Sequence, residues 1–506
     1  MSNNTSRHKI WDIIDSLMSI KIAVISDLHY SAEPNPLIPK RRGELSAILL
    51  LRAVHRFNRF IKPDIVLVAG DLINDPAAPD AGKLSEELRD ILSLLQMPSL
   101  IIPGNHDLKG EEFYRIFSRP KLFTDIGNVR FVAFDDPETP GYNATRTPQD
   151  IEIMRRARDG WRGQLVSVQH VPLVPPHAAP YNYDNADELL KIFGECGYTA
   201  SVSGHFHNGL EPIRHGGTTL LTVAAGCETP FPYYVVEIDD AGHVSQTTEF
   251  LSLDPALKLK DYHVHTPFAY CNENMSIPMI NTLADAFGLA GTVISEHSSH
   301  LYFERPSYGA KVYYHRGLEA QDQCRTAEYF AMFEELAGPG NTLGMEVDFD
   351  HLGRPVIESE DWKRLQFRNG AIHALKAISE KADYETVKDN FMFQVESILK
   401  SGVDLLVHPF RIFSFNGITR LSKPTELYEP LALMLKKYGV AAEVNYHINE
   451  PEPEFFKTCI AHGVKIAFGS DSHNLYEVGE FYPHLKLLEE IAPGAAADPS
   501  LFIQKG

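Results

Sequence analysis

The sequence is poor in cysteine and has no long hydrophobic run, and these two absences exclude several classes of protein. Its 506 residues include five cysteines without a CxxC pair, which argues against a disulfide scaffold and fits a reducing cytosol. No stretch approaches the ~18 consecutive apolar residues of a membrane span. The first residues, MSNNTSRHKIWDIIDSLMS, carry acidic groups where a signal peptide is apolar, and they indicate a short amphipathic helix. We therefore expect a cytoplasmic protein with no membrane partner.

Positive charge is also scarce. The chain has 47 Lys and Arg against 67 Asp and Glu, which gives a formal net charge of -20. An acidic chain repels a nucleic-acid backbone unless a local basic patch offsets it, so long nucleic acid is not expected as the main partner. A small phosphorylated substrate remains compatible, because bound metal cations reverse the potential locally.

The length predicts two or three domains, since a domain usually has ~100–200 residues. In the first half, apolar runs typical of buried strands alternate with helical patterns at 45–60 and 84–95. After Gly204 the strands follow one another directly, which predicts a β-meander ending near residue 253. The runs before the meander are 20–26, 64–70, 99–104, 130–135, 164–170 and 199–205.

The second half begins after a predicted linker at 253–261. Strand-like runs recur there seven times, mostly separated by helical segments, and this alternation predicts a parallel sheet closed into a barrel. The predicted fold class is therefore α/β, with one domain at 1–254 and a second at 255–506. The seven runs are 259–265, 291–297, 341–348, 367–374, 403–409, 440–445 and 464–471.

Polar clusters follow the buried strands of the first half. Because open α/β sheets place their sites at the carboxyl ends of strands, we expect these side chains to converge. Two divalent ions ~3.5–4 Å apart can hold a phosphoryl group and activate water near neutral pH. A shared carboxylate with nitrogen and oxygen donors suits Mn, Fe or Zn. The clusters are Asp27 and His29; Asp71; Asn105, His106 and Asp107; His170; and His205 and His207.

These residues resemble the calcineurin-like metallophosphoesterase family, whose motifs DxH, GD, GNHD, H and GHxH are present in order between about 20 and 250. The resemblance implies an αββα sandwich with two metals, in which Asp71 bridges both ions. His106 would contact the phosphate and help protonate the leaving oxygen, and Asp107 would orient His106. The other ligands would be Asp27, His29 and His207 for the first metal, and Asn105, His170 and His205 for the second.

The strands of the second half end in a similar way. Six of the seven ends supply at least one potential metal ligand, and functional residues at these ends are typical of a barrel active site. The ends carry His263 and His265; Glu296 and His297; Glu346 and Asp348; His373; His408; Asn445; and Asp471 and His473.

This half resembles the PHP (polymerase and histidinol phosphatase) family, and within it the histidinol-phosphatase branch. The matching stretches are DYHVHTPF, SEH, GMEVD, GAIHAL, LLVHPF and FGSDSH, over about 259–500. The resemblance implies a distorted (β/α)7 barrel with two or three metals. The first would take His263, His265, Glu346 and Asp471; the second Glu346, His373 and His408; the third His297 and His473.

Cys271 stands where the family often has a histidine, six residues after His265. A thiolate can replace an imidazole ligand and favours zinc or iron, so we predict that Cys271 ligates the third metal. The alternative is a small buried cysteine that packs beside a two-metal site.

Three cations are candidate substrate-binding groups. Arg305 and Lys311 lie in the long segment between the second and third barrel strands, and Arg411 follows His408 at the predicted barrel mouth. Such cations can bind a phosphate or a carboxylate. For Arg305 and Lys311 the alternative is a solvated loop and helix face.

The leading hypothesis is a bifunctional metal-dependent phosphoesterase for small molecules. The first domain would cleave diesters, cyclic diesters included, and the PHP domain would hydrolyse monoesters. A nuclease or nucleic-acid-end-processing enzyme is the alternative, for which RPSYGAKVYYHR is a short candidate for a basic and aromatic stripe. In a third hypothesis, one domain is a regulatory module that binds a phosphorylated ligand. The sequence gives no indication of the oligomeric state.

Overall fold

The computed structural model of the chain describes residues 19–415 and 424–505, so the expected amphipathic helix lies outside the described residues. The chain divides into two compact units, Met1–Ser252 and Leu253–Gly506, and the boundary expected after residue 254 adjoins this division. Both units combine helices and strands, so the predicted α/β class is confirmed. In the described ranges no helix has the length and apolar character needed to cross a membrane.

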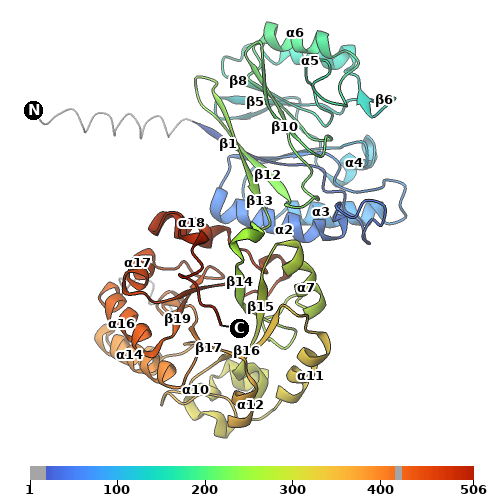
Figure 1. Ribbon diagram of the computed structural model, residues 1–506. Helices are drawn as coiled ribbons and strands as arrows, with labels where there is room; N and C mark the ends of the chain where they lie inside the picture. The colour runs from blue at the N-terminus through green and yellow to red at the C-terminus, as the bar shows by residue number, and fades with distance from the viewer. Residues whose placement is uncertain (1–18, 416–423, 506) are drawn as a thin grey trace, which may run out of the picture. The chain divides into compact units, whose positions relative to one another are not determined.

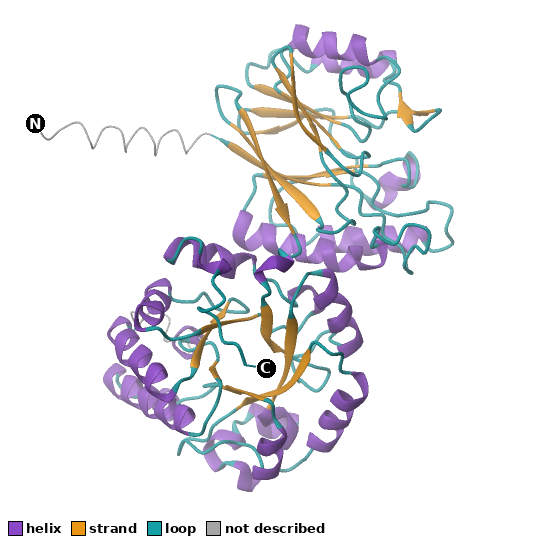
Figure 2. Cartoon of the chain, viewed as in Figure 1, coloured by secondary structure: helices purple, strands orange, loops and turns teal. Residues whose placement is uncertain are grey.

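The first unit contains two sheets with helices outside them (Figures 1 and 2). One sheet has the order β13-β12-β1-β2-β3, and the other has the order β10-β11-β9-β8-β5-β4. The strands of the first sheet are β1 (Ile20–Ile25), β2 (Ile65–Ala69), β3 (Ser99–Ile102), β12 (Pro232–Ile238) and β13 (Val244–Phe250). The strands of the second are β4 (Thr124–Ile126), β5 (Val129–Ala133), β8 (Gln164–Val168), β9 (Ala200–Ser203), β10 (Leu210–His215) and β11 (Thr218–Thr222).

Aliphatic side chains from both sheets form the main core. Val24 and Leu67 from the first sheet and Val166 and Val202 from the second belong to one fully buried cluster. Strands β1 and β2 are nearly continuous runs of apolar residues because parallel strands are covered on both faces. The same burial explains why the sequence alone located these strands.

Helices cover the outer faces of the two sheets. A second core cluster places Met154 of α5 and Leu189 of α6 against Val132 and Leu165 of the second sheet. The predicted helix at 45–60 is α2, followed by a π turn at Phe57–Ile61, and the one at 84–95 is α3. The helices of this unit are α2 (Ser46–Arg56), α3 (Ala81–Leu92), α4 (Glu111–Ile116), α5 (Pro148–Arg156) and α6 (Ala186–Cys196).

The predicted β-meander after Gly204 is wrong. Strand β11 pairs in parallel with β9 in the second sheet, whereas β12 pairs antiparallel with β1 in the first sheet. Consecutive strands do pair antiparallel within each sheet, β10 with β11 in the second sheet and β12 with β13 in the first, where Tyr234 lies opposite Thr248. Short apolar runs reveal a strand but not its partner, so consecutive strands were assigned to one sheet.

A small hairpin projects beside the second sheet, formed by β6 (Glu138–Thr139) and β7 (Asn143–Ala144). A buried ion pair lies at its base, where the Arg146 guanidinium contacts the Asp136 carboxylate at 2.7 Å. The Tyr183 hydroxyl donates a further hydrogen bond of 2.6 Å to Asp136. The hairpin is therefore anchored in the protein interior although its tip is exposed.

The second unit is a closed barrel of seven parallel strands, as predicted (Figure 1). The barrel closes between β14 and β20, where Asp261 pairs with Phe468. Its lower interior is filled by Tyr262, Val293, Phe367 and other apolar side chains, so the polar groups concentrate at the carboxyl ends of the strands. The strands are β14 (Lys260–Val264), β15 (Gly291–His297), β16 (Asn341–Val347), β17 (Phe367–Gly370), β18 (Leu405–Leu406), β19 (Ala441–Asn445) and β20 (Ile466–Gly469).

Helices surround this barrel (Figure 2). Their starts follow local rules: the longest, α14, begins where the Asp383 carboxylate accepts the Thr386 backbone N–H at 2.9 Å. The helices are α7 (Ile277–Ala286), α8 (Ser298–Tyr302), α9 (Arg305–Gly309), α10 (Val312–Arg316), α11 (Thr326–Leu336), α12 (Ser359–Arg364), α13 (Lys376–Ser379), α14 (Tyr384–Lys400), α15 (Arg411–Phe415), α16 (Tyr428–Tyr438), α17 (Pro453–His462) and α18 (Tyr482–Ile491).

Candidate metal centres

The predicted ligands of the first unit lie just beyond the carboxyl ends of β1, β2, β3, β8 and β9. Four of them have a left-handed backbone, with φ between 46° and 65°: Asp27, His29, Asp71 and His205. This conformation is unfavourable for residues other than glycine and persists where the surrounding structure enforces it, often at functional sites. The strand ends thus direct these side chains into one buried region.

Two imidazoles in this region present acceptor atoms to each other. His170 Nδ1 donates to the Ala69 carbonyl at 2.7 Å, and His205 Nε2 donates to the Tyr142 carbonyl at 3.0 Å. In the neutral rings each remaining nitrogen holds a lone pair, and His205 Nδ1 lies 3.2 Å from His170 Nε2. The Asn105 Oδ1 atom, also an acceptor, lies 3.1 Å from His170 Nε2. Such an arrangement requires a cation between the acceptors.

A second group of acceptors lies on the other side of Asp71. His207 Nδ1 donates to Glu228 Oε1 at 2.7 Å, which leaves His207 Nε2 facing His29 Nε2 at 3.0 Å and Asp27 Oδ1 at 3.6 Å. Among the described residues, the buried His29 Nδ1 has no hydrogen-bond partner. The facing acceptor atoms of His207, His29 and Asp27 could therefore bind a second metal ion.

Asp71 lies between the two groups. Its Oδ2 atom is 3.6 Å from His29 Nε2 and 3.3 Å from His170 Nε2. Burial opposes ionisation of Asp71, but His170 and His29 hold its pKa well below the ordinary value. Burial likewise opposes a charge on His170, yet Asp71 and Asp27 raise its pKa to about 9. The region therefore attracts positive charge, either as a proton or as a metal.

His106 is oriented by a different group from the one predicted. Its Nδ1 atom donates to the Asn74 carbonyl at 2.7 Å, which leaves Nε2 directed away from that contact. Asp107 instead accepts three backbone N–H groups, those of Leu72, Ile73 and Gly104. The prediction that Asp107 orients His106 is thus corrected, because the carboxylate is occupied in fixing two loops.

Two glycines allow the backbone to approach the carboxylates. A Cβ atom at Gly104 would lie 2.1 Å from Asp71 Oδ1, and one at Gly204 would lie 2.5 Å from Asp27 Oδ2. Neither glycine has a positive φ, so close approach, rather than turn geometry, requires glycine at these positions.

In the barrel, five histidines surround the carboxylate of Glu346 at the end of β16. Burial opposes its ionisation, but His297, His373 and His263 hold its pKa well below the ordinary value. The central place of this carboxylate suits a group that two or more ions share. The distances to Oε1 are 2.8 Å from His408 Nε2 and 3.2 Å from His373 Nε2; those to Oε2 are 2.5 Å from His297 Nδ1, 3.5 Å from His263 Nε2 and 3.7 Å from His265 Nε2.

Further carboxylates fix the orientation of these rings. His263 Nδ1 donates to Glu443 Oε1 at 2.8 Å, and His373 Nδ1 donates to Asp348 Oδ1 at 2.7 Å. In both rings the other nitrogen then faces Glu346, which is the arrangement of imidazoles that bind metals. Sequence reasoning placed Asp348 at a strand end without an orienting role, and it missed Glu443 within β19. An acidic residue within an otherwise apolar strand was the available signal, since such residues are seldom buried unpaired.

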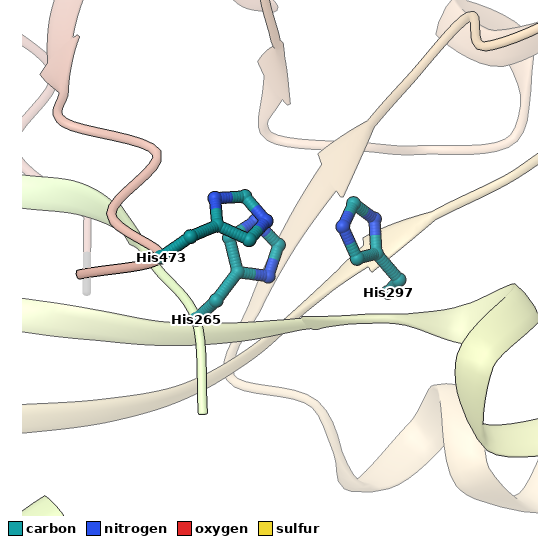
Figure 3. A group of neighbouring side chains, drawn as sticks. All are labelled: His265, His297 and His473. Atoms are coloured by element: carbon teal, nitrogen blue, oxygen red, sulfur yellow. The ribbon is translucent and has the colours of Figure 1, made fainter. Parts of the chain in front are cut away.

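A third group of potential ligands contains His265, His297 and His473 (Figure 3). The ring of His265 stacks on both others, with centroids 4.2 Å from His473 and 4.3 Å from His297. His473 Nδ1 donates to the Asp471 carbonyl at 2.8 Å, so its Nε2 atom presents a lone pair. The three neighbouring imidazoles are therefore suitable ligands for the predicted third metal.

Cys271 reaches the same place from the loop after β14. Its Sγ atom is 3.8 Å from His297 Nε2, and two tetrahedral zinc ligands of these types would be about 3.5 Å apart. The thiol is exposed, so the alternative of a buried packing cysteine is wrong. Cys271 and His297 also form a group of potential ligands with His300, which the sequence did not single out.

The three predicted substrate-binding cations are placed differently from one another. Arg411 is buried, and its guanidinium contacts the carboxylate of Asp471 and donates to Asn445 Oδ1 at 3.1 Å. Within the described ranges, no hydrogen bond or ion pair joins Arg305 or Lys311 to the barrel cluster, which favours the solvated-face alternative for these two.

The segment RPSYGAKVYYHR does not form an exposed aromatic stripe. Tyr313 and Tyr314 are 2% and 1% exposed, and the Tyr314 hydroxyl accepts the Lys376 backbone N–H at 2.6 Å. A stacking surface for single-stranded nucleic acid needs exposed rings. This segment therefore gives the nuclease alternative no support.

Comparison with known proteins relates the chain to one enzyme family. A sequence model of the calcineurin-like phosphoesterases matches residues 20–209. The glycerophosphodiester phosphodiesterase GpdQ of Enterobacter lignolyticus (strain SCF1) is 32% identical over 241 residues, which is 42% of this chain and 82% of that protein. A dimetal phosphatase from Danio rerio has 18% identity and a TM-score of 0.37, covering 46% of this chain and 98% of its own. The protein TT1561 of Thermus thermophilus has 13% identity and a TM-score of 0.32, covering 45% and 98%.

Proposed function

The chain belongs to the calcineurin-like phosphoesterases and is a metal-dependent phosphoesterase, and from this premise we propose that it is bifunctional. In this proposal the first unit cleaves small phosphodiesters and the barrel, as a PHP domain, hydrolyses phosphomonoesters. One observation carries it: each unit has its own buried carboxylate, Asp71 or Glu346, surrounded by imidazoles whose free nitrogens face it.

In the first unit, Asp71 is the shared ligand of two divalent ions. When bound, these ions supply charge stabilisation for the phosphoryl group and an activated water. The Asn74 carbonyl holds a proton on His106 Nδ1 and so orients the ring, which leaves Nε2 as the atom that can pass a proton to the leaving oxygen. The remaining ligands are Asp27, His29 and His207 on one side, and Asn105, His170 and His205 on the other.

Small diesters are the substrate class that suits this site. A pocket beside His170 and His205 is lined by Lys109, Asp135 and Tyr142, so the leaving group meets an ammonium, a carboxylate and an aromatic ring. The similarity to a glycerophosphodiester phosphodiesterase puts glycerophosphodiesters first among the compounds to test. Cyclic diesters belong to the same chemical class.

In the barrel, Glu346 is the shared ligand of two or three divalent ions of the Mn, Fe or Zn type. The carboxylates of Glu443 and Asp348 hold His263 and His373 so that their free nitrogens point at Glu346. Cys271 supplies a thiolate to the third ion. The other ligands are His265 and Asp471 for the first ion, His408 for the second, and His297 and His473 for the third.

The two activities form a chemical sequence. Hydrolysis of a phosphodiester releases a phosphomonoester, and a phosphomonoester is the substrate proposed for the barrel. One chain would then convert a diester to two alcohols and inorganic phosphate.

Phosphorus NMR of the full-length, metal-loaded protein tests this proposal. The panel contains glycerophosphodiesters, nucleotides, cyclic nucleotides, sugar phosphates and cyclic sugar phosphates. We expect a diester signal to give way first to a monoester and then to phosphate. If no diester is hydrolysed, the proposal for the first unit is refuted. If no monoester is hydrolysed, the proposal for the barrel is refuted.

A further inference from the structure

His300 is a buried histidine that none of the roles above uses. It lies in the short helix α8, directly after β15, and its exposed fraction is 0%. Its ring centroid is 4.2 Å from that of His297. Potential ligand atoms of Cys271, His297 and His300 all lie within 4.8 Å of one another.

The hydrogen bonding of His300 fixes its tautomer. Its Nδ1 atom accepts the backbone N–H of Tyr270, with the two nitrogens 3.2 Å apart. A backbone amide can only donate, so Nδ1 must hold a lone pair, and the single proton of the neutral ring is on Nε2. A ring with its proton on Nε2 cannot ligate a metal through that atom.

The Nε2–H group points at no acceptor. Nε2 is buried and, within the described part of the chain, has no hydrogen-bond partner. An unpaired buried donor is costly, so its position requires a reason. A candidate acceptor among the potential ligands grouped with His300 is Cys271, whose Sγ atom becomes a strong acceptor once it is a thiolate.

The surrounding structure holds His300 and the Cys271 loop together. The carbonyl of His300 accepts hydrogen bonds from Gln323 Nε2 at 2.8 Å and from Arg325 Nη2 at 2.6 Å. Gln323 Nε2 also lies 2.6 Å from the Tyr270 hydroxyl, next to Cys271. These contacts connect α8 to the loop that carries Cys271, so the ring and the thiol are held in the same region.

We propose that His300 is a positioning residue that donates its Nε2–H to the Cys271 thiolate when this thiolate ligates a metal. The inference rests on the proposed function of the barrel. A hydrogen bond to sulfur holds Sγ in place and withdraws charge from it, which tunes the metal–sulfur bond. An imidazole ligand at position 271 has no second lone pair to accept this proton, so Cys271 and His300 form a matched pair.

Cobalt substitution of the full-length protein tests the proposal, because a cobalt–thiolate bond gives a charge-transfer band in the near ultraviolet. We expect this band in the native protein and its absence in Cys271→Ser. In His300→Phe, which lacks the donor, the band should move to lower energy and cobalt should bind about 10–100-fold more weakly. His300→Gln keeps an N–H donor and should restore the band position. His462→Phe, at the end of α17, is the matched control and should change neither property.

Three results would overturn the inference. An unchanged band in His300→Phe would show that His300 donates no hydrogen bond to the thiolate. Loss of one bound cobalt per chain in that variant would show that His300 is itself a ligand. The absence of a band in the native protein shows that Cys271 is not a ligand. Monoester hydrolysis by the same loaded samples reports separately on the proposed function, since the barrel can hydrolyse monoesters without a cobalt–thiolate bond. Circular dichroism checks the fold, and His300→Leu replaces His300→Phe if phenylalanine is not tolerated.

Discussion

At the scale of single residues, each proposed centre depends on one carboxylate that no neighbouring residue can replace. Asp71 Oδ2 reaches toward His29 and His170 at once, whereas its Oδ1 atom accepts the His106 backbone N–H at 2.8 Å. One oxygen thus holds the loop, and the other faces the two imidazoles where the metals are proposed to bind. These separate roles of the two oxygens make the position sensitive to a change of charge alone.

We predict that Asp71→Asn abolishes diester hydrolysis while the fold survives. The amide keeps an oxygen for the His106 N–H but removes the charge that both ions share, so activity should fall by orders of magnitude. Diester hydrolysis and bound metal are measured on the same samples, with circular dichroism as the check of folding. Near-normal activity on every diester would disprove the bridging role.

A second prediction concerns Glu228, which holds the ring of His207 through a hydrogen bond of 2.7 Å. Glu228→Gln weakens this bond and leaves all proposed ligands in place, so metal affinity should fall about 10–100-fold. Metal titration followed by recovery of activity measures the change. Glu211→Gln, on the edge strand β10, is the matched control. Equal affinities in the two variants would show that Glu228 does not support the site.

The positions of the proposed metal ligands at the strand ends were predictable from the sequence, but the residues that orient these ligands were not. Asp27 and His170 follow apolar strands and Glu346 lies near the end of one, all in recognisable motifs, so their positions at the carboxyl edge could be deduced. Tyr142 acts through its backbone carbonyl, and a carbonyl leaves no trace in residue type. The same holds for the Asn74 carbonyl, which is why the orientation of His106 was assigned to Asp107.

At the scale of elements, the β6–β7 hairpin connects stability to the first site. Its tip carries Tyr142, whose carbonyl fixes the tautomer of His205, and its base contains the buried pair of Arg146 and Asp136. Burial opposes the charge on Arg146, but Asp136 raises its pKa above the ordinary value. The polar anchor of the hairpin therefore depends on the presence of both partners.

We predict that Asp136→Ala destabilises the protein by about 3–5 kcal/mol, because the change leaves the Arg146 charge buried and unpaired. Urea denaturation measures the loss. The double variant Asp136→Ala with Arg146→Met should recover much of the stability, since no charge then remains buried. Glu195→Ala breaks an exposed pair with Arg155 and should have little effect. A single variant as stable as the native protein would contradict the anchoring role.

The sequence predicted where the strands lie better than it predicted which strands pair. The seven barrel strands were found because each combines a buried run with a polar end, although β18 has only two residues in its ladder, Leu405 and Leu406. The pairing of β11 with β9 was missed because both runs are short and apolar and therefore fit either sheet. Tertiary packing decided between partners that the local pattern could not distinguish.

At the scale of the whole molecule, the two groups of ligands do not interleave along the chain. Those of the first unit end at His207, and those of the barrel start at His263, on either side of the division at Ser252. Each group of proposed ligands lies within its own unit, so the two proposed activities should be separable by mutation.

We therefore predict that His106→Ala abolishes diester hydrolysis and leaves monoester hydrolysis intact. His408→Ala, which removes a ring 2.8 Å from Glu346, should have the opposite effect. Both activities are assayed for both variants, and His243→Ala, an exposed histidine that pairs with Asp239, is the control. Loss of both activities in one correctly folded variant would indicate a shared site.

Metal removal should also change the stability of the protein. Ions that bind the native state and not the unfolded chain add free energy as RT ln(1 + [L]/Kd), about 2.7 kcal/mol for each site at a hundred times its Kd. Dialysis against a chelator should lower the melting temperature, and added manganese or zinc should restore it. Asp71→Asn should respond less to the chelator than the native protein does. Identical melting curves with and without chelator would contradict metal binding at both centres.

The facing lone pairs of His170 and His205, 3.2 Å apart, have a consequence for the life of the protein in a cell. Without metal, a proton on His170, whose pKa is raised to about 9, is the cation that remains to separate these acceptors. The metal-free chain then lacks the stabilisation that bound ions give the native state, so it opens more often and exposes its backbone to proteases. Since proteolysis follows the population of opened molecules, starvation for metal would shorten the half-life of the protein. Its abundance would then report how much metal the cell can supply, quite apart from the reaction that it catalyses.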